Sequence, residues 1–125
     1  MVQCDVYNED VVEQSCAALK FDAVVTSLCL EAACKTLDDF KLAIKKIAKL
    51  LVPGGYFIIL TVLNESFYLV GGHKFFCLDV TEVDVVDALM GAGFKLLKKK
   101  NMLPPATGNY ASDFPGLVVL LAQKD

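Results

Sequence analysis

The sequence predicts an α/β fold built around a parallel sheet, on three observations. Tyr56 to Leu63 is apolar at almost every position, which indicates a central strand covered by helices on both faces. A segment with helical periodicity comes before it, and Pro53-Gly54-Gly55 separates the two. The composition is 55% hydrophobic with a mean hydropathy of +0.50, which favours a sheet buried on both sides. A chain of 125 residues is long enough for one domain.

The N-terminal third contains two predicted strands and a predicted helix. Met1 to Val6 is apolar enough for the end of a strand, and a helix is predicted from Asn8 or Glu9 to Leu19. Phe21 to Ser27 is short and rich in β-branched residues, so it is predicted to be a second buried strand. It continues into an apolar loop or short helical turn at Leu28 to Cys34.

The next helix has a clear start and an apolar stripe. Thr36 has the spacing of an N-cap residue, with acidic residues in the first turn. The apolar side chains that follow at helical spacing are Leu37, Phe40, Ile44, Ile47 and Leu51. The lysines expected on the solvent face are Lys41, Lys45, Lys46 and Lys49.

The C-terminal half continues the alternation of helix and strand. The connection at 64–77 is longer than the usual 2–6 residues between a strand and a helix, and its length indicates a functional role. Thr81 caps another predicted helix, which Gly91 and Gly93 end. A strand follows from Phe94 to Leu97 or beyond, with the lysines of 98–100 at its exposed end. A long loop at 102–115 leads to the last strand at 116–123.

Composition argues against several classes of function. The net charge is −3 and the 12 basic residues lie mostly in two local clusters, so we expect no nucleic-acid partner. No apolar run reaches the roughly 20 residues that span a bilayer, so no membrane partner is expected. The first ten residues are acidic and carry no basic region of a secretory signal, which favours a cytoplasmic protein. Five cysteines without a C-x-x-C pair, with His73 as the only histidine, indicate reduced thiols rather than a zinc site.

The order of elements and four sequence blocks resemble a known family. No helix is expected between the last two strands, as in the Rossmann-like fold of class I S-adenosylmethionine-dependent methyltransferases, whose final strand is antiparallel. The four blocks are residues 26–34, 51–55, 65–71 and 116–124. In these blocks the sequence resembles the group that contains nicotinamide, phenylethanolamine, indolethylamine and thioether methyltransferases.

The resemblance implies that residues 1–125 form the C-terminal portion of a single methyltransferase domain. The family's glycine-rich turn, its ribose-binding acid and its N-terminal aromatic residues have no counterpart here, and Gly54-Gly55 is not that turn. The strand at Asp22–Thr26 would then lack its usual neighbour. We therefore expect the chain alone to self-associate through this sheet edge and to bind S-adenosyl-L-methionine very weakly.

The resemblance also implies positions for the cofactor, S-adenosyl-L-methionine. Asp5 and Val6 resemble the pair beside the adenine, where a carboxylate accepts from the exocyclic amine and a branched side chain packs on the ring. Ser27 and Leu28 resemble the positions under the cofactor. They follow the carboxyl end of a strand, where ligands bind in open α/β sheets.

The same resemblance implies a small amine as substrate. Glu31 falls where the group has an acid after Cys-Leu. Glu65 and Asp113 match positions of acids that face the substrate amine and side chain in phenylethanolamine-type enzymes, and Tyr68 matches an aromatic position common to the group. These acids favour an alkyl amine. The expected reaction is an in-line methyl transfer to nitrogen, which depends on alignment and needs no metal.

Two alternatives stay open. Nicotinamide-type enzymes have an aspartate and a serine where this chain has Thr61 and Cys77, which line the predicted substrate site. A pyridine-nitrogen substrate is therefore the alternative within enzymes. The alternative from another class is a catalytically inactive fragment that acts as an interaction module on a full-length paralogue.

Overall fold

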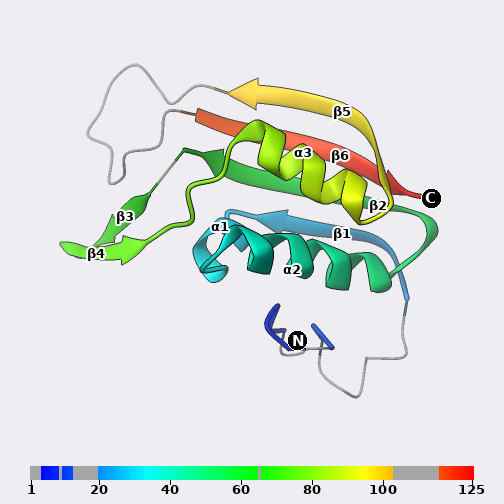
Figure 1. The fold of residues 1–125 in the computed structure, drawn as a ribbon, viewed down its shortest axis with the longest axis horizontal. Coiled ribbons are helices and arrows are strands. Elements are labelled where there is room, and N and C mark those ends of the chain that lie inside the picture. Colours follow the sequence, from blue (N-terminus) through cyan, green and yellow to red (C-terminus); the bar gives the residue numbers. More distant parts are fainter. Residues whose placement is uncertain (1–3, 9, 13–19, 65, 103–115) are drawn as a thin grey trace.

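A mixed four-stranded sheet forms the centre of the protein (Figure 1). The computed structural model describes residues 4–8, 10–12, 20–64, 66–102 and 116–125. The strand order is β1-β2-β6-β5, with β1 at Phe21–Ser27, β2 at Leu51–Leu63, β5 at Phe94–Met102 and β6 at Gly116–Lys124. β1 and β2 are adjacent and parallel, whereas β6 runs antiparallel to both of its neighbours, β2 and β5. The predicted α/β fold with an antiparallel last strand is confirmed.

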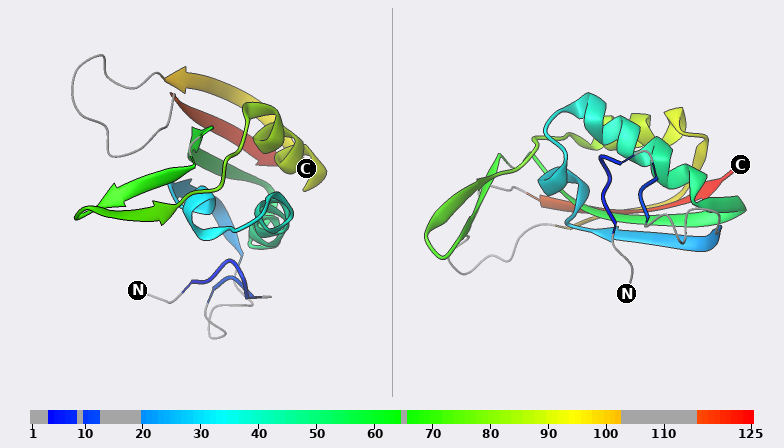
Figure 2. Two further views of the ribbon diagram at one scale, coloured as in Figure 1. Left: turned by 60° about the vertical axis from the view of Figure 1, so that its left-hand side comes forward. Right: turned by 90° about the horizontal axis from the view of Figure 1, so that it is seen from below.

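Three helices lie on the same side of this sheet: α1 at Leu30–Ala33, α2 at Leu37–Lys49 and α3 at Glu82–Gly91 (Figure 2, right). The N-caps of α2 and α3 are those that the sequence predicts. The Thr36 side chain accepts from the Asp39 N–H at 3.1 Å, and Thr81 and Asp84 form a reciprocal capping box. No helix of the described residues is long and apolar enough to cross a membrane.

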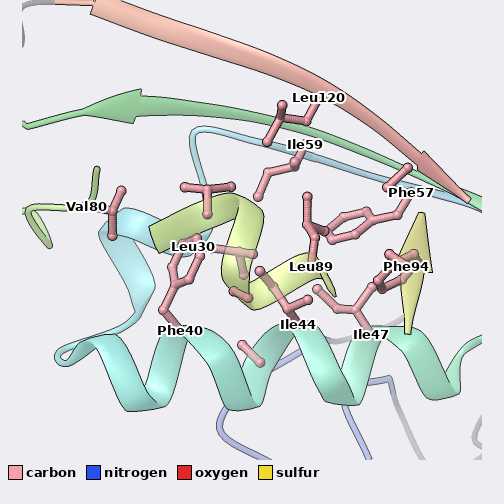
Figure 3. Packing of buried hydrophobic residues seen from close by; sticks show 14 of the residues in the cluster. Leu30, Phe40, Ile44, Ile47, Phe57, Ile59, Val80, Leu89, Phe94 and Leu120 are labelled. Carbon is pink, nitrogen blue, oxygen red and sulfur yellow. The ribbon is translucent and has the colours of Figure 1, made fainter. Parts of the chain in front are cut away.

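The hydrophobic core fills the space between these helices and the sheet (Figure 3). Phe40 and Ile44 of α2 point toward the strands, and Leu89 of α3 points to the same place. From the sheet, Phe57 meets Phe94 with their ring centroids 5.5 Å apart. The apolar spacing that predicted α2 therefore marks the side that packs on the sheet.

The other side of the sheet has no helix among the described residues, so the expectation of helices on both faces is wrong for them. Val25 of β1 is 64% exposed and Tyr56 of β2 is 43% exposed. Ile58 and Leu60 are only partly buried. An apolar run predicts that a face suits burial, but a packed partner is needed to bury it. We call this side the open face; its apolar members include Val25, Tyr56, Ile58, Leu60, Val119 and Leu121.

The junction between α2 and β2 differs from the prediction. The helix ends at Lys49 instead of Leu51, and Leu51 is already the first residue of β2. The predicted turn at 53–55 is an irregularity inside β2, because Phe21 pairs with Leu51 and Ala23 pairs with Tyr56. A Cβ on Gly55 would lie 2.9 Å from the Val52 carbonyl oxygen and 3.1 Å from that of Asp22. Glycine is therefore required at position 55, where β2 passes close to the backbone of β1.

The N-terminal segment also differs from the prediction. Asn8 and residues 10–12 are not helical, and Cys4 pairs with Val12 in an isolated antiparallel bridge. The rest of the predicted helix lies outside the described residues. Lys46, predicted on the solvent face of α2, is buried instead, and its Nζ donates to the carbonyl oxygens of Val6 and Tyr7 at 3.3 Å. The segment therefore packs on α2 and covers that lysine.

The long connection after β2 forms a hairpin that projects from the sheet (Figure 1). It consists of β3 at Phe67–Val70 and β4 at His73–Phe76. Gly71 and Gly72 between them have φ values of 58° and 81°, so both residues of this two-residue turn adopt positive φ, as a type I′ turn requires. The sequence held the signal for this hairpin, a Gly-Gly pair between two β-prone runs.

The lysine run lies within β5 and does not follow it, because the strand continues to Met102. Lys99 pairs with Leu120 on the helix-covered side, and its Nζ lies 3.0 Å from a carboxylate oxygen of Glu82 on α3. Lys98 and Lys100 pair with Leu121 and Val119 instead, and so belong to the open face. The run therefore divides between the two faces of the sheet.

Candidate functional site

The carboxyl ends of β1 and β2 lie at one edge of the sheet, and the backbone there is unusual. Ser27 is the last residue of β1, and Leu28 after it has a φ of 53°. The left-handed region costs a residue with a Cβ about 1–2 kcal/mol. Leu28 is held there by its N–H, which donates to the Leu60 carbonyl oxygen at 2.9 Å, while its side chain stays 50% exposed. Ser27 and Leu28 are therefore presented at the edge where α/β sheets bind ligands.

A buried carboxylate lies next to this edge. Glu31 of α1 is 2% exposed and Thr61 of β2 is fully buried. The Thr61 hydroxyl lies 2.8 Å from Glu31 Oε2 and 3.3 Å from the Val62 carbonyl oxygen, so its single proton makes the shorter bond to the carboxylate. The structure therefore brings together two of the residues that the sequence predicts for the substrate site.

Cys77 joins this region through its neighbour in the chain. The Leu78 N–H donates to the Glu31 carbonyl oxygen at 2.7 Å, and the Cys77 N–H donates to the Ser66 carbonyl oxygen at 3.0 Å. Cys77 is buried and directly precedes Leu78, the residue that bonds to Glu31. The base of the hairpin, α1 and the end of β2 therefore converge on Glu31.

Sequence reasoning missed one backbone feature of this edge. Asn64 follows β2 with a φ of 55°, and its N–H donates to the Val80 carbonyl oxygen at 2.9 Å. Asparagine tolerates the left-handed region better than most residues, so its position after an apolar strand was the available signal. The left-handed conformation of Asn64 turns the chain out of β2 toward the hairpin.

The structure does not describe the side chains of three predicted substrate residues. Glu65 and Asp113 lie outside the described residues. Tyr68 belongs to β3, where its backbone pairs with Phe75, and its side chain is not described. All three stay predictions.

Asp5 and Val6 lie beside α2. Asp5 Oδ1 accepts from the Tyr7 N–H at 2.9 Å. The Tyr7 hydroxyl accepts from the Lys35 N–H at 2.8 Å and lies 3.0 Å from Asp39 Oδ2, which ties the segment to the start of α2. No hydrogen bond or ion pair of the described residues joins Asp5 or Val6 to the end of β1. Their predicted contact with an adenine therefore stays a prediction.

Two cysteines near the site, Cys29 and Cys34, are held in their neutral form. Cys34 is buried, and desolvation, aided by the negative charge of Asp39, raises its pKa to about 11. Desolvation, followed by the charge of Glu31, also raises the pKa of Cys29. Because the thiolate is the nucleophilic form, neither thiol is activated at neutral pH. Among the described residues, no three side chains of the metal-binding types gather at one point.

The fold is similar to those of solved methyltransferase structures. It is similar to a solved S-adenosylmethionine-dependent methyltransferase from Methanosarcina mazei, with a TM-score of 0.67 and 20% identity, over 86% of this chain and 62% of that one. It is also similar to 1,6-didemethyltoxoflavin-N1-methyltransferase of Burkholderia thailandensis, with a TM-score of 0.61 and 21% identity, over 84% of this chain and 44% of that one. The fold is that of the class I methyltransferases.

The chain belongs to the NNMT/PNMT/TEMT family, which matches residues 1–125. It is 36% identical to human phenylethanolamine N-methyltransferase over 111 residues, which are 86% of this chain and 39% of that protein. Human nicotinamide N-methyltransferase is 31% identical, over 82% of this chain and 39% of that protein. The chain therefore spans about two fifths of the length of these relatives. The family resemblance drawn from the four sequence blocks is confirmed.

Proposed function

We propose that this chain is the C-terminal portion of a cytosolic S-adenosylmethionine-dependent N-methyltransferase that acts on a small alkyl amine. The observation that carries the proposal is the buried Glu31 carboxylate, held by Thr61 beside the carboxyl ends of the parallel strands. Family membership supplies the reaction class, since the relatives are named as N-methyltransferases of phenylethanolamine, indolethylamine and nicotinamide.

The Glu31–Thr61 pair favours a cationic substrate over a neutral ring nitrogen. Thr61 is uncharged and its hydroxyl donates to Glu31, so the pair carries at most one negative charge. A carboxylate binds an ammonium through a charge-assisted hydrogen bond. An acid at position 61, as in nicotinamide-type enzymes, would set two carboxylates against each other and raise the pKa of one. The Thr61 hydroxyl avoids that repulsion, which supports the alkyl amine.

The residues at the sheet edge fit the cofactor in part. When bound, S-adenosyl-L-methionine supplies a methyl group on a sulfonium centre. The exposed Ser27 and Leu28 would support it from the end of β1. Asp5 and Val6 would contact the adenine, with the Val6 side chain against the ring.

The acids of the site would bind and orient the amine rather than activate it. A carboxylate favours the ammonium form, which has no lone pair to donate. The ammonium must therefore release a proton to water before its nitrogen forms the new bond to carbon and the bond from carbon to sulfur breaks. Alignment of the reacting atoms can supply about 7–11 kcal/mol of the barrier. In this proposal Glu31, Glu65 and Asp113 contribute through position.

The substrate assignment can be tested in a chimaera in which this chain replaces the matched part of human phenylethanolamine N-methyltransferase. We expect transfer of labelled methyl from S-adenosylmethionine to phenylethanolamine and little transfer to nicotinamide. The Thr61→Asp variant should lose most of the amine activity, whereas Thr61→Ser should keep it. Preference for nicotinamide would contradict the alkyl-amine assignment.

Glu65 provides a second test in the same chimaera. The Glu65→Ala variant should bind phenylethanolamine more weakly by about 1.5–3 kcal/mol, the value of a hydrogen bond to a charged group, with cofactor affinity unchanged. Calorimetric titration measures both affinities. Equal loss of the two would mean that Glu65 has a structural role.

An interaction module is the second candidate function, favoured by the free edge of β1. Among the described residues β1 pairs only with β2, and its outer edge carries no lysine. The chain alone is expected to self-associate through this edge and to bind S-adenosylmethionine hardly at all. Size-exclusion chromatography with calorimetric titration at micromolar concentration is the measurement. The Val25→Lys variant should reduce self-association; a monomer that binds cofactor with micromolar affinity would contradict this expectation.

A further inference from the structure

A tight turn at residues 5–8 carries the two residues proposed for the adenine contact. The Asn8 N–H donates to the Asp5 carbonyl oxygen at 3.1 Å and closes a β-turn, while the Tyr7 N–H donates to Asp5 Oδ1 at 2.9 Å. An aspartate at the first position of a turn reaches the backbone two residues later in this way. Among the described residues no hydrogen bond reaches the second oxygen, Oδ2. The turn therefore orients the Asp5 carboxylate and leaves one of its oxygens for a ligand.

Tyr7 attaches this turn to the start of α2. The N-terminal segment lies beside that helix (Figure 1, Figure 2). The Tyr7 hydroxyl accepts from the Lys35 N–H at 2.8 Å and donates to Asp39 Oδ2 at 3.0 Å. A hydroxyl has one proton and two lone pairs, so it can hold both partners at once. Tyr7 therefore bonds to Asp5 through its backbone and to α2 through its side chain.

Lys46 binds the same turn from further along α2. Its buried Nζ donates to the carbonyl oxygens of Val6 and Tyr7, both at 3.3 Å. Burying an ammonium group is costly unless it is hydrogen-bonded, so Lys46 and the turn stabilise each other. Lys46 follows Asp39 by two turns of the helix, or about 10 Å. Two attachments this far apart fix both the position and the angle of the turn on α2.

The hydroxyl of Tyr7 contributes more to this attachment than its ring. The side chain of Tyr7 is 46% exposed, so burial of the ring alone does not hold the segment in place. The hydroxyl, in contrast, has both a donor and an acceptor within 3.0 Å. Phenylalanine at this position would keep the ring and lose both bonds. The substitution therefore isolates what the hydroxyl does.

We infer that Tyr7 is a positioning residue of the cofactor site, whose hydroxyl fixes the turn so that the Asp5 carboxylate is aimed at the exocyclic amine of the adenine. This role rests on the adenine contact of the proposed function and adds to it a source of selectivity. A carboxylate accepts a hydrogen bond from the amine of adenine but repels the carbonyl oxygen that hypoxanthine has in its place. A carboxylate that is free to turn away separates the two bases less well.

The experiment uses the chimaera with human phenylethanolamine N-methyltransferase and two probes, S-adenosylhomocysteine and S-inosylhomocysteine, in which hypoxanthine replaces adenine. Calorimetric titration measures both affinities. The Tyr7→Phe variant should bind S-adenosylhomocysteine about fivefold more weakly and should prefer it less over the inosyl compound. Tyr56→Phe is the matched control, because Tyr56 is 43% exposed and lies on the open face. It should leave both affinities within about twofold.

Hydrogen exchange on the 125-residue chain without cofactor tests the attachment itself. The Lys35 N–H donates to the Tyr7 hydroxyl, so it should exchange faster in Tyr7→Phe than in the unaltered chain or in Tyr56→Phe. Circular dichroism on each variant checks that it is folded. Unchanged exchange at Lys35 would mean that the hydroxyl does not hold the turn, and would overturn the inference.

The Asp5→Ala variant of the chimaera separates this role from the proposed function. If Asp5→Ala weakens S-adenosylhomocysteine binding and Tyr7→Phe does not, only the role of Tyr7 is overturned. If neither variant weakens it, the adenine contact of the proposed function is overturned as well. Equal weakening of both probes by Tyr7→Phe would show a general structural role and would also contradict the inference. Methyl transfer is not a readout, so the result does not depend on which amine the enzyme methylates.

Discussion

The two faces of the sheet have similar sequences and different surroundings. Along β2, Phe57 and Ile59 are buried under the helices, while the alternate residues Tyr56 and Ile58 face the other way and keep part of their surface exposed. All four side chains are large and apolar. The difference teaches that hydrophobicity marks the surface a strand is suited to bury, whereas the elements packed on it decide what is buried.

The largest expected contrast lies between two neighbours in the chain. Phe57→Ala removes a fully buried ring that packs on Phe94 and should lower the free energy of unfolding by about 3–5 kcal/mol. Ile58→Ala, on the open face, should cost clearly less, since part of the removed surface is already hydrated. Urea unfolding followed by circular dichroism measures both. Equal losses would mean that the open face is buried in solution.

The buried pair on the covered side gives the next contrast. Thr61→Val keeps the shape of the side chain but removes the hydrogen bond to the Glu31 carboxylate, and should cost about 1.5–3 kcal/mol. Thr61→Ser keeps the hydroxyl and is the matched control. Both are measured by urea unfolding at neutral pH. A valine variant as stable as the serine variant would show that this hydrogen bond does not hold Glu31.

Cys34 makes the covered side sensitive to alkaline pH. Burial, with the charge of Asp39, raises its pKa from 9.0 to about 11, so the folded state holds the thiol proton more tightly than the unfolded state. The stability that the protonated Cys34 thiol contributes is fully present below about pH 9 and is lost as the pH rises toward 11. The melting temperature should therefore fall more in the unaltered protein than in Cys34→Ala over that range. Parallel curves for the two proteins would contradict the prediction.

The smallest contrast is between two adjacent lysines of β5. Lys99→Ala breaks the ion pair with Glu82 and should cost at most about 1 kcal/mol, whereas Lys98→Ala on the open face should cost nothing measurable. The hydrogen bond from Lys99 also lowers the pKa of Glu82, so that pKa should rise in the Lys99→Ala variant alone. An NMR titration of the Glu82 carboxyl measures this. An unchanged pKa would mean that the pair does not persist in solution.

Local sequence was sufficient for the elements whose signals are local. Thr36 and Thr81 cap their helices because their hydroxyls accept from backbone N–H groups three residues later, and the strands follow from runs of apolar residues. Lys46 shows the limit: its spacing placed it with the exposed lysines, yet carbonyl oxygens about forty residues earlier in the chain accept its protons. The open face shows the same limit, because no local signal states which partners are packed against a strand.

The site was predicted as single residues and not as an arrangement. Family resemblance pointed to Glu31 and Thr61 separately, but the hydrogen bond between them joins residues 30 positions apart and depends on β1 and β2 being neighbours. The left-handed backbone of Leu28 could not be predicted from residue type, because it is set by a hydrogen bond to the distant Leu60 carbonyl oxygen, whereas Asn64 is a residue type that tolerates this conformation. The position of Val6 depends on a hydrogen bond from Lys46 of α2 that the sequence does not encode locally, whereas the Asp5 carboxylate accepts from the nearby Tyr7 N–H.

The position of β6 between β2 and β5 has a consequence for how the protein is made. β6 is synthesised after β2 and β5, yet both of these strands pair with it, and the Gln123 side chain bonds to the Gly54 carbonyl oxygen from 69 residues away. Until it leaves the ribosome, β2 has one neighbour and β5 has none in the sheet. Contacts so distant in sequence form slowly, and unpaired apolar strands in a nascent chain are targets for aggregation. The sheet therefore closes only after translation of residues 116–124, and chaperones that shield β2 during that interval should raise the yield of folded protein.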